Sequence, residues 1–215
     1  DLEFYGVWRR IVEFEISRNK LKTISDNTVV EFGVHGAIGK RIGGVSSRDV
    51  NIDIDTLLNN LYSIVKSSQE DPSWQGFSKG YSKGVDVENY DKNIVEATYE
   101  KGVEILEASM NESIDYAKRN GAENVNVSAG GLSLTYGGVL IANIDGEEMY
   151  GEGTNSSFSL EVVSSKAGRS SSFFAYHSSS RLSMSEILEE ARRAGEYSVK
   201  FIDAKPVESG EYTII

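Results

Sequence analysis

The sequence is dominated by stretches in which apolar and polar residues alternate, separated by turn residues. From Val12 to Ile16, apolar side chains occupy every second position, and glutamates fill the positions between them. Successive side chains of a β-strand point to opposite faces, so this pattern predicts a strand with one buried and one polar face. Further strands are expected at 21–24, 29–34, 40–45, 124–128, 132–136, 139–144, 148–151, 156–164 and 170–177.

Short polar and glycine-rich segments mark the turns between these strands. The segment 18–20 is expected to join the first two strands, and Gly137-Gly138 and Asp145-Gly146 are expected turns between later ones. Two serine clusters, at 170–172 and 178–180, lack the Gly-x-Ser-x-Gly pattern of a nucleophilic serine. We interpret them as turn and cap residues.

Three segments have the three-to-four-residue apolar spacing of amphipathic helices, namely 53–67, 91–120 and 183–199. Asp53 or Asp55 can cap the start of the first helix, and Gly121 is suited to end the second. Ser183 and Glu186 have the spacing of a capping box at the start of the third.

Hairpin, strands and helix recur in the same order in two parts of the chain. This order predicts an α+β fold made of duplicated units of antiparallel or mixed β-sheet with helices packed on one face. The expected domain spans 1–205, with half-repeats at about 1–68 and 91–205 joined by an aromatic and glycine-rich loop at 69–90. The segment 206–215 alternates like a first strand leading toward a further domain, so we expect the chain to be a piece of a longer protein.

Composition argues against several classes of function. The 33 acidic and 22 basic residues give a net charge of −11 with no long basic tract, which argues against a nucleic-acid partner. No apolar run approaches the roughly 20 residues that cross a bilayer, so no membrane partner is expected. There is no cysteine, and the two histidines, His35 and His177, lack the neighbours of a metal site. We therefore assign no catalytic and no metal-binding residue to this chain, and we expect a cytoplasmic location.

The joining loop is unusually aromatic. Trp74, Phe77 and Tyr81 lie among Gly76, Gly80 and other loop residues. We favour a loop held on the body of the protein by these rings, because buried aromatic surface stabilises a fold. The alternative is a ligand-binding loop, in which the same three rings are the candidate substrate-binding residues.

Five stretches, in this order, resemble the TldD/PmbA family, whose members are known as modulators of DNA gyrase and as microcin-processing peptidases. Residues 17–24, Ser-Arg-Asn-Lys-Leu-Lys-Thr-Ile, are similar to its first hairpin, with Lys20 in place of the usual glycine. Residues 33–47 are similar to its next strand pair, although the turn is rearranged and Gly44 replaces an aromatic residue. Residues 71–76, Asp-Pro-Ser-Trp-Gln-Gly, resemble its joining loop, and residues 141–146 and 204–213 together resemble later family patterns.

The resemblance implies the N-terminal domain of an intracellular, zinc-dependent peptidase, shaping the substrate cleft and a dimer. Its implied partners are unfolded or extended peptides and a second subunit, in a homodimer or a TldD–PmbA-type heterodimer. The family's zinc-binding histidines would follow this segment, so the resemblance implies no cofactor in this chain, which alone would not be catalytic. Two alternatives remain open: a noncatalytic partner subunit of the PmbA (TldE) type, and a stand-alone peptide-binding or assembly module.

Overall fold

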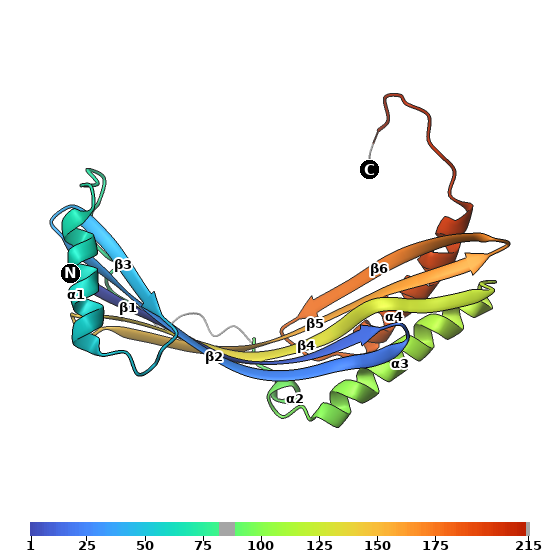
Figure 1. Ribbon diagram of the computed structural model, residues 1–215, viewed down its shortest axis with the longest axis horizontal. Helices are drawn as coiled ribbons and strands as arrows, with labels where there is room; N and C mark the ends of the chain where they lie inside the picture. The colour runs from blue at the N-terminus through green and yellow to red at the C-terminus, as the bar shows by residue number, and fades with distance from the viewer. Residues whose placement is uncertain (82–88, 214–215) are drawn as a thin grey trace.

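The computed structural model describes residues 1–81 and 89–213, and its centre is a six-stranded antiparallel sheet (Figure 1). The strand order is β3-β2-β1-β4-β5-β6, so the β1–β4 pair lies in the middle. The strands are β1 (Leu2–Ser17), β2 (Lys20–Ile38), β3 (Arg41–Ser47), β4 (Asn124–Asn143), β5 (Glu148–Lys166) and β6 (Arg169–Ser179).

Two of the expected turns are confirmed by their backbone conformation. Between β1 and β2, Arg18 and Asn19 both have positive φ, 52° and 61°. Consecutive positive φ values are typical of the tight hairpin turns that match strand twist. Between β4 and β5, Gly146 has a φ of 83°, a conformation that glycine adopts without steric cost.

The turn expected at Gly137-Gly138 is wrong, because β4 continues straight through both residues. The glycines are required by close approach of neighbouring groups instead. A Cβ atom at Gly137 would overlap the carbonyl oxygen of Trp8, and one at Gly138 would lie 2.6 Å from the hydroxyl oxygen of Tyr150. The pair therefore makes room for the side chains and backbone of the adjacent strands.

The helices begin where the sequence places caps. The side chain of Asp53 accepts a hydrogen bond from the Thr56 amide at the start of α1 (Ile54–Ser67). Ser183 accepts one from the Glu186 amide at the start of α4 (Met184–Lys200), and a 3-10 turn, η1 (Phe201–Asp203), follows. The helix expected over 91–120 is instead two helices, α2 (Lys92–Val95) and α3 (Tyr99–Arg119). Asp91 and Thr98 each cap a separate start, and this divides the segment.

The order β-β-β-α occurs twice, as β1-β2-β3-α1 and as β4-β5-β6-α4, with α2 and α3 preceding the second unit. The sheet is bent into an arc, and α1, α3 and α4 lie against its convex side (Figure 1). The expected α+β class, with helices on one face of antiparallel strands, is therefore confirmed.

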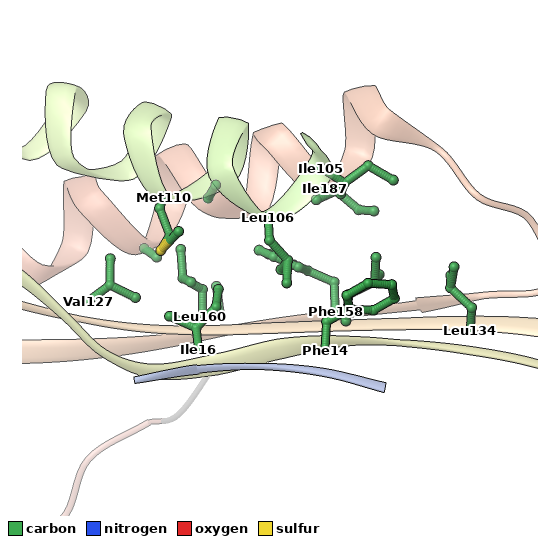
Figure 2. Close-up of a cluster of buried hydrophobic side chains, with 14 of the residues drawn as sticks. Phe14, Ile16, Ile105, Leu106, Met110, Val127, Leu134, Phe158, Leu160 and Ile187 are labelled. Carbon is green, nitrogen blue, oxygen red and sulfur yellow. The ribbon is translucent and has the colours of Figure 1, made fainter. Parts of the chain in front are cut away.

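The main core lies between the sheet and the pair α3 and α4 (Figure 2). Phe14 on β1 and Phe158 and Leu160 on β5 point toward Leu106 on α3 and Ile187 on α4. A smaller core under α1 contains Val34, Leu57, Leu61 and Val65. Because the apolar residues of each strand alternate with polar ones, burying one face leaves the opposite face polar.

The C-terminal segment departs from expectation. Residues 204–213 have no regular secondary structure, so the strand expected at 206–215 does not form over 206–213. Pro206 has no amide hydrogen to donate, and no strand of the described residues pairs with this segment. Residues 214–215 lie outside the described residues.

A charged cluster ties the first hairpin to α3. Asp26 accepts hydrogen bonds from the Arg10 guanidinium at 2.6 Å and from the Tyr99 hydroxyl at 2.8 Å. Hydrogen bonding from Arg10 and then from Tyr99 lowers the pKa of Asp26 to about 2. The bound form is the carboxylate, so its contribution to stability is present above the unfolded pKa of roughly 4. That contribution is lost as the pH falls through about 2.

We expect Asp26→Asn to be less stable than the wild-type chain at pH 7 and to approach it between about pH 4 and pH 2. Urea unfolding at a series of pH values measures the difference. Asp115→Asn removes an exposed carboxylate from α3 that forms no ion pair within 1–81 and 89–213, so it is the matched control. A stability difference for Asp26→Asn that stays constant from pH 7 to pH 2 would contradict this account.

Candidate functional site

The concave side of the sheet is the candidate site. Within 1–81 and 89–213 no helix covers it (Figure 1). Strand pairing has two irregularities on this sheet, at Glu15/Ile16 in β1 and at Val127/Ala129 in β4. Such bulges bend a strand and increase its twist, and both lie near the same end of the sheet.

Two rows of side chains cross the concave face at this bend. The strand register places Ser25, Glu13, Ser133, Ser157 and Ser178 in one row, across β2, β1, β4, β5 and β6. The adjacent row, on the same five strands, consists of Thr23, Glu15, Gly131, Ser159 and Tyr176. Between the rows, the side chains of Phe14, Leu132 and Phe158 point the other way, into the core. The same alternation that builds the core therefore builds a hydroxyl-rich surface behind it.

These rows line a hollow of about 360 Å³. Its size is at the lower end of ordinary ligand pockets, roughly 300–1,000 Å³. The walls carry hydroxyl groups, two carboxylates and one aromatic ring, that of Tyr176. Such a surface offers donors and acceptors of hydrogen bonds beside apolar area.

The hydroxyl groups of the first row are linked to one another. Ser157 donates to the side-chain oxygen of Asn155 at 2.9 Å, and the Asn155 amide donates to the Ser178 hydroxyl at 3.1 Å. Hydrogen bonding from Ser178 and then from Ser157 lowers the pKa of Tyr176. The interpretation of the serines at 170–172 and at 178 and 179 as turn and cap residues is wrong, because all five lie within β6.

The aromatic loop lies against the opposite end of the same sheet. The Trp74 and Phe77 rings meet edge to face at 5.0 Å, and Phe77 stacks on His35 at 6.4 Å between ring centroids. The Tyr81 hydroxyl donates to Glu3 at 3.0 Å. The Lys79 side chain and the Gly80 amide bind Asp145 and Glu147 at the β4–β5 turn. The rings thus pack on the body of the protein, and residues 82–88 lie outside the described residues.

We expect Trp74→Ala to lower the free energy of unfolding by about 1–2 kcal/mol, because the half-buried ring loses its contact with Phe77. The oligomeric state should not change, since the contact lies within one chain. Urea unfolding and size-exclusion chromatography measure the two quantities, with the exposed Tyr62→Ala as the control. A change in oligomeric state without a loss of stability would show that the ring packs on a partner chain.

The structure does not bring the loop and the hollow together. Tyr81 binds Glu3, whereas the hollow begins at Glu13, ten residues further along β1. At about 3.3 Å per residue, the two places are separated by roughly 33 Å of strand. The candidate substrate-binding residues Trp74, Phe77 and Tyr81 therefore lie at one end of the concave face. The hydroxyl rows near the other end were not predicted from the sequence. A signal was present in the run Ser157, Phe158, Ser159, Leu160, where every second residue is a serine.

The histidines do not form a metal site with each other. His35 on β2 lies 3.6 Å from a carboxylate oxygen of Glu3, and His177 on β6 lies 3.5 Å from one of Glu186. Three strands separate β2 from β6 in the sheet. No group of three or more potential metal ligands occurs within 1–81 and 89–213. The family resemblance implies zinc only outside this segment, so no step through a metal is derived for this chain.

Comparison with known proteins identifies the class of this chain. The model of a family described as the PmbA/TldA metallopeptidase central domain matches residues 92–200, which is half of the chain and lies within the second expected half-repeat. The chain therefore belongs to the TldD/PmbA family. Comparison with curated protein sequences returned no match.

Three solved structures share the fold. TldE from Thermococcus kodakarensis has a TM-score of 0.77 at 18% identity, over 93% of this chain and 44% of that one. A proposed modulator of a DNA gyrase from Thermotoga maritima has a TM-score of 0.79 at 14% identity, over 97% and 46%. A second proposed modulator of DNA gyrase, from Bacteroides thetaiotaomicron, has a TM-score of 0.76 at 18% identity, over 98% of this chain and 48% of that one. The chain thus spans less than half the length of each of these proteins.

Among the helices that the structure describes, none has the length and apolar character needed to cross a bilayer.

Proposed function

We propose that this chain is the peptide-binding domain of a TldD/PmbA-type metallopeptidase or of its partner subunit. The observation that supports the proposal most directly is the concave face, which no helix of the described residues covers, with its hydroxyl-lined hollow. An extended peptide presents hydrogen-bonding groups along its whole length and requires a long, polar surface with few large side chains. The rows across β1, β4, β5 and β6 form such a surface.

Recognition in this proposal differs from pairing along a free strand edge. The segment 132–136, a strand expected from the sequence, does not offer such a free edge. Those residues lie in β4, which is hydrogen-bonded to β1 on one side and β5 on the other. A bound peptide would therefore lie across the face of the sheet, in contact with side chains of several strands.

The remaining parts of the proposal rest on family membership. The zinc and the catalytic residues would belong to another part of the full-length protein, which would be cytoplasmic and would act as a homodimer or as a TldD–PmbA-type heterodimer. A noncatalytic partner subunit is the second candidate, and the shared fold with TldE is the observation that favours it. Both candidates use the concave face in the same way.

Blocking the hollow tests the proposed role. We expect Ser157→Trp to weaken binding of unstructured, fluorescently labelled decapeptides by at least about tenfold, because an indole ring would occupy the space between the rows. Fluorescence anisotropy measures the affinity, and thermal unfolding of the same variant verifies that it folds. Asn59→Trp places the same ring on the exposed surface of α1 and is the matched control. Equal affinity of a folded Ser157→Trp variant and the wild-type chain would contradict the proposal.

A further inference from the structure

The described part of the chain lines the hollow with charges of one sign. Of the lining residues within 1–81 and 89–213, only Glu13 and Glu15 carry a formal charge, and both are on β1. They follow the alternation of the strand, so both carboxylates stand on the concave face while Phe14 between them enters the core. The surface therefore offers negative charge on its β1 side.

The two carboxylates differ in whether a basic side chain neutralises their charge. Glu15 forms an ion pair with Lys22 at 2.8 Å, which neutralises it locally. Glu13 has the Ser25 hydroxyl at 3.5 Å and no cation among the described residues. The ammonium group of Lys22 is held by Glu15, two residues further along β1. On β1 itself, the nearest basic residue on the concave side is Arg9, four residues away, or roughly 13 Å along the strand. Much of an interaction at that separation is screened at physiological ionic strength.

An aromatic ring completes the site. Tyr176 lies in the same row as Glu15, two strands beyond β4, and its side chain is on the surface, with the residue 57% exposed. The face of a tyrosine ring attracts cations, and so does an unpaired carboxylate. The hydroxyls of Ser133, Ser157 and Ser159 between them can accept hydrogen bonds from a protonated amine or a guanidinium.

We propose that the hollow binds a cationic side chain, lysine or arginine, of an extended peptide, with Glu13 as its counter-ion. The inference rests on the proposed peptide-binding function and adds the class of residue that is preferred. Glu13 supplies the charge, the serine hydroxyls orient the donor groups, and Tyr176 covers the apolar stem of the bound side chain. Glu15 attracts the bound cation less than Glu13 does, because it is paired with Lys22.

Three peptides that differ at one position test the preference. Each is a nine-residue, acetylated and amidated Gly/Ser/Thr chain with a neutral dye, and the central residue is lysine, its uncharged isostere norleucine, or glutamate. We expect the lysine peptide to bind the wild-type chain about five- to tenfold more tightly than the norleucine peptide, with the glutamate peptide weakest. Raising the ionic strength from 0.05 M to 0.5 M should reduce the advantage of lysine.

Charge-neutralising variants locate the preference. Glu13→Gln should remove most of the difference between the lysine and norleucine peptides. Glu107→Gln makes the same change of net charge on α3, where Glu107 has no ion pair within the described residues, and should leave the preference intact. The substitution at Glu13 is at an exposed position, and thermal unfolding verifies that the variant is folded.

The outcomes separate this inference from the proposed function. Equal binding of the lysine and norleucine peptides to the wild-type chain, or a preference that survives in Glu13→Gln, would overturn the cationic pocket and leave the peptide-binding role standing. Absence of binding by all three peptides would overturn both. Loss of the preference in Glu107→Gln as well as in Glu13→Gln would show that net charge, and not the hollow, attracts the cation.

Discussion

Replacing Phe14 by alanine is expected to lower the free energy of unfolding by about 3–5 kcal/mol. The ring is only 2% exposed and lies between the sheet and α3, among Leu106, Phe158 and Ile187 (Figure 2). It touches the helix at Gly102, where any Cβ atom would overlap the ring. Removing it leaves a cavity that the flanking strands and helix close only in part, so the lost contacts add to the lost burial.

Urea or thermal unfolding measures this effect, and Phe174→Ala is the matched control. Phe174 lies on β6 and is 58% exposed, so its removal should change stability by less than about 1 kcal/mol. For a chain of this length, the loss at Phe14 corresponds to a fall of about 10 °C in Tm. A Phe14→Ala variant as stable as Phe174→Ala would show that the core between sheet and helices is not packed as described.

A second large effect is expected from Gly195→Ala, which should destabilise the protein by about 1–3 kcal/mol. In an ordinary helix interior this substitution is stabilising by roughly 0.5–1 kcal/mol. Here α4 crosses α3 so closely that a Cβ atom at Gly195 would overlap the carbonyl oxygen of Ser113. That oxygen belongs to the backbone of α3, so the two helices would have to move apart.

The control for this substitution is Gly151→Ala on β5, where an added Cβ meets no atom within 4 Å. It should be neutral or slightly stabilising. Chemical unfolding of both variants gives the comparison. If Gly195→Ala were stabilising, the close contact between α3 and α4 would be absent in solution.

The parts of the fold that could be predicted from the sequence are those set by local chemistry. Alternation over Val12–Ile16 marks the strand face that enters the core, and Asp53 and Ser183 mark helix starts through the hydrogen bonds of their side chains. The hairpin at Arg18 and Asn19 is local in the same sense, because it depends on two consecutive backbone conformations.

The wrong predictions concern features whose structure is determined by residues far away in the sequence or by competing local interactions. Gly137 and Gly138 look like a turn in the sequence, but groups of Trp8 and Tyr150 on the neighbouring strands explain them. The position of β4 in the middle of the sheet depends on its pairing with β1, more than 100 residues earlier in the chain, and alternation along one strand does not specify its neighbours. The break between α2 and α3 depends on Thr98. Its side chain caps the start of α3, and this is incompatible with a helix that continues through Thr98.

The candidate site was predictable only in part. Trp74, Phe77 and Tyr81 stand out as aromatic residues in a loop, and the structure places them on the concave face, packed on the body. The hydroxyl rows do not stand out, since serine is common in turns and caps as well as on polar strand faces. Their meaning emerges only when the register aligns Ser133, Ser157 and Ser178 across three strands.

Mapping the peptide on the protein tests the central claim most directly. A decapeptide that carries a benzophenone at its centre is photo-crosslinked to the wild-type chain, and mass spectrometry identifies the modified residues. We predict crosslinks to the concave-face residues of β1, β4, β5 and β6, above all around Ser133, Ser157 and Tyr176. These crosslinks should be lost with excess unlabelled peptide. Crosslinks that fall on the outer surfaces of α1, α3 and α4 and leave the concave face unmodified would contradict the account.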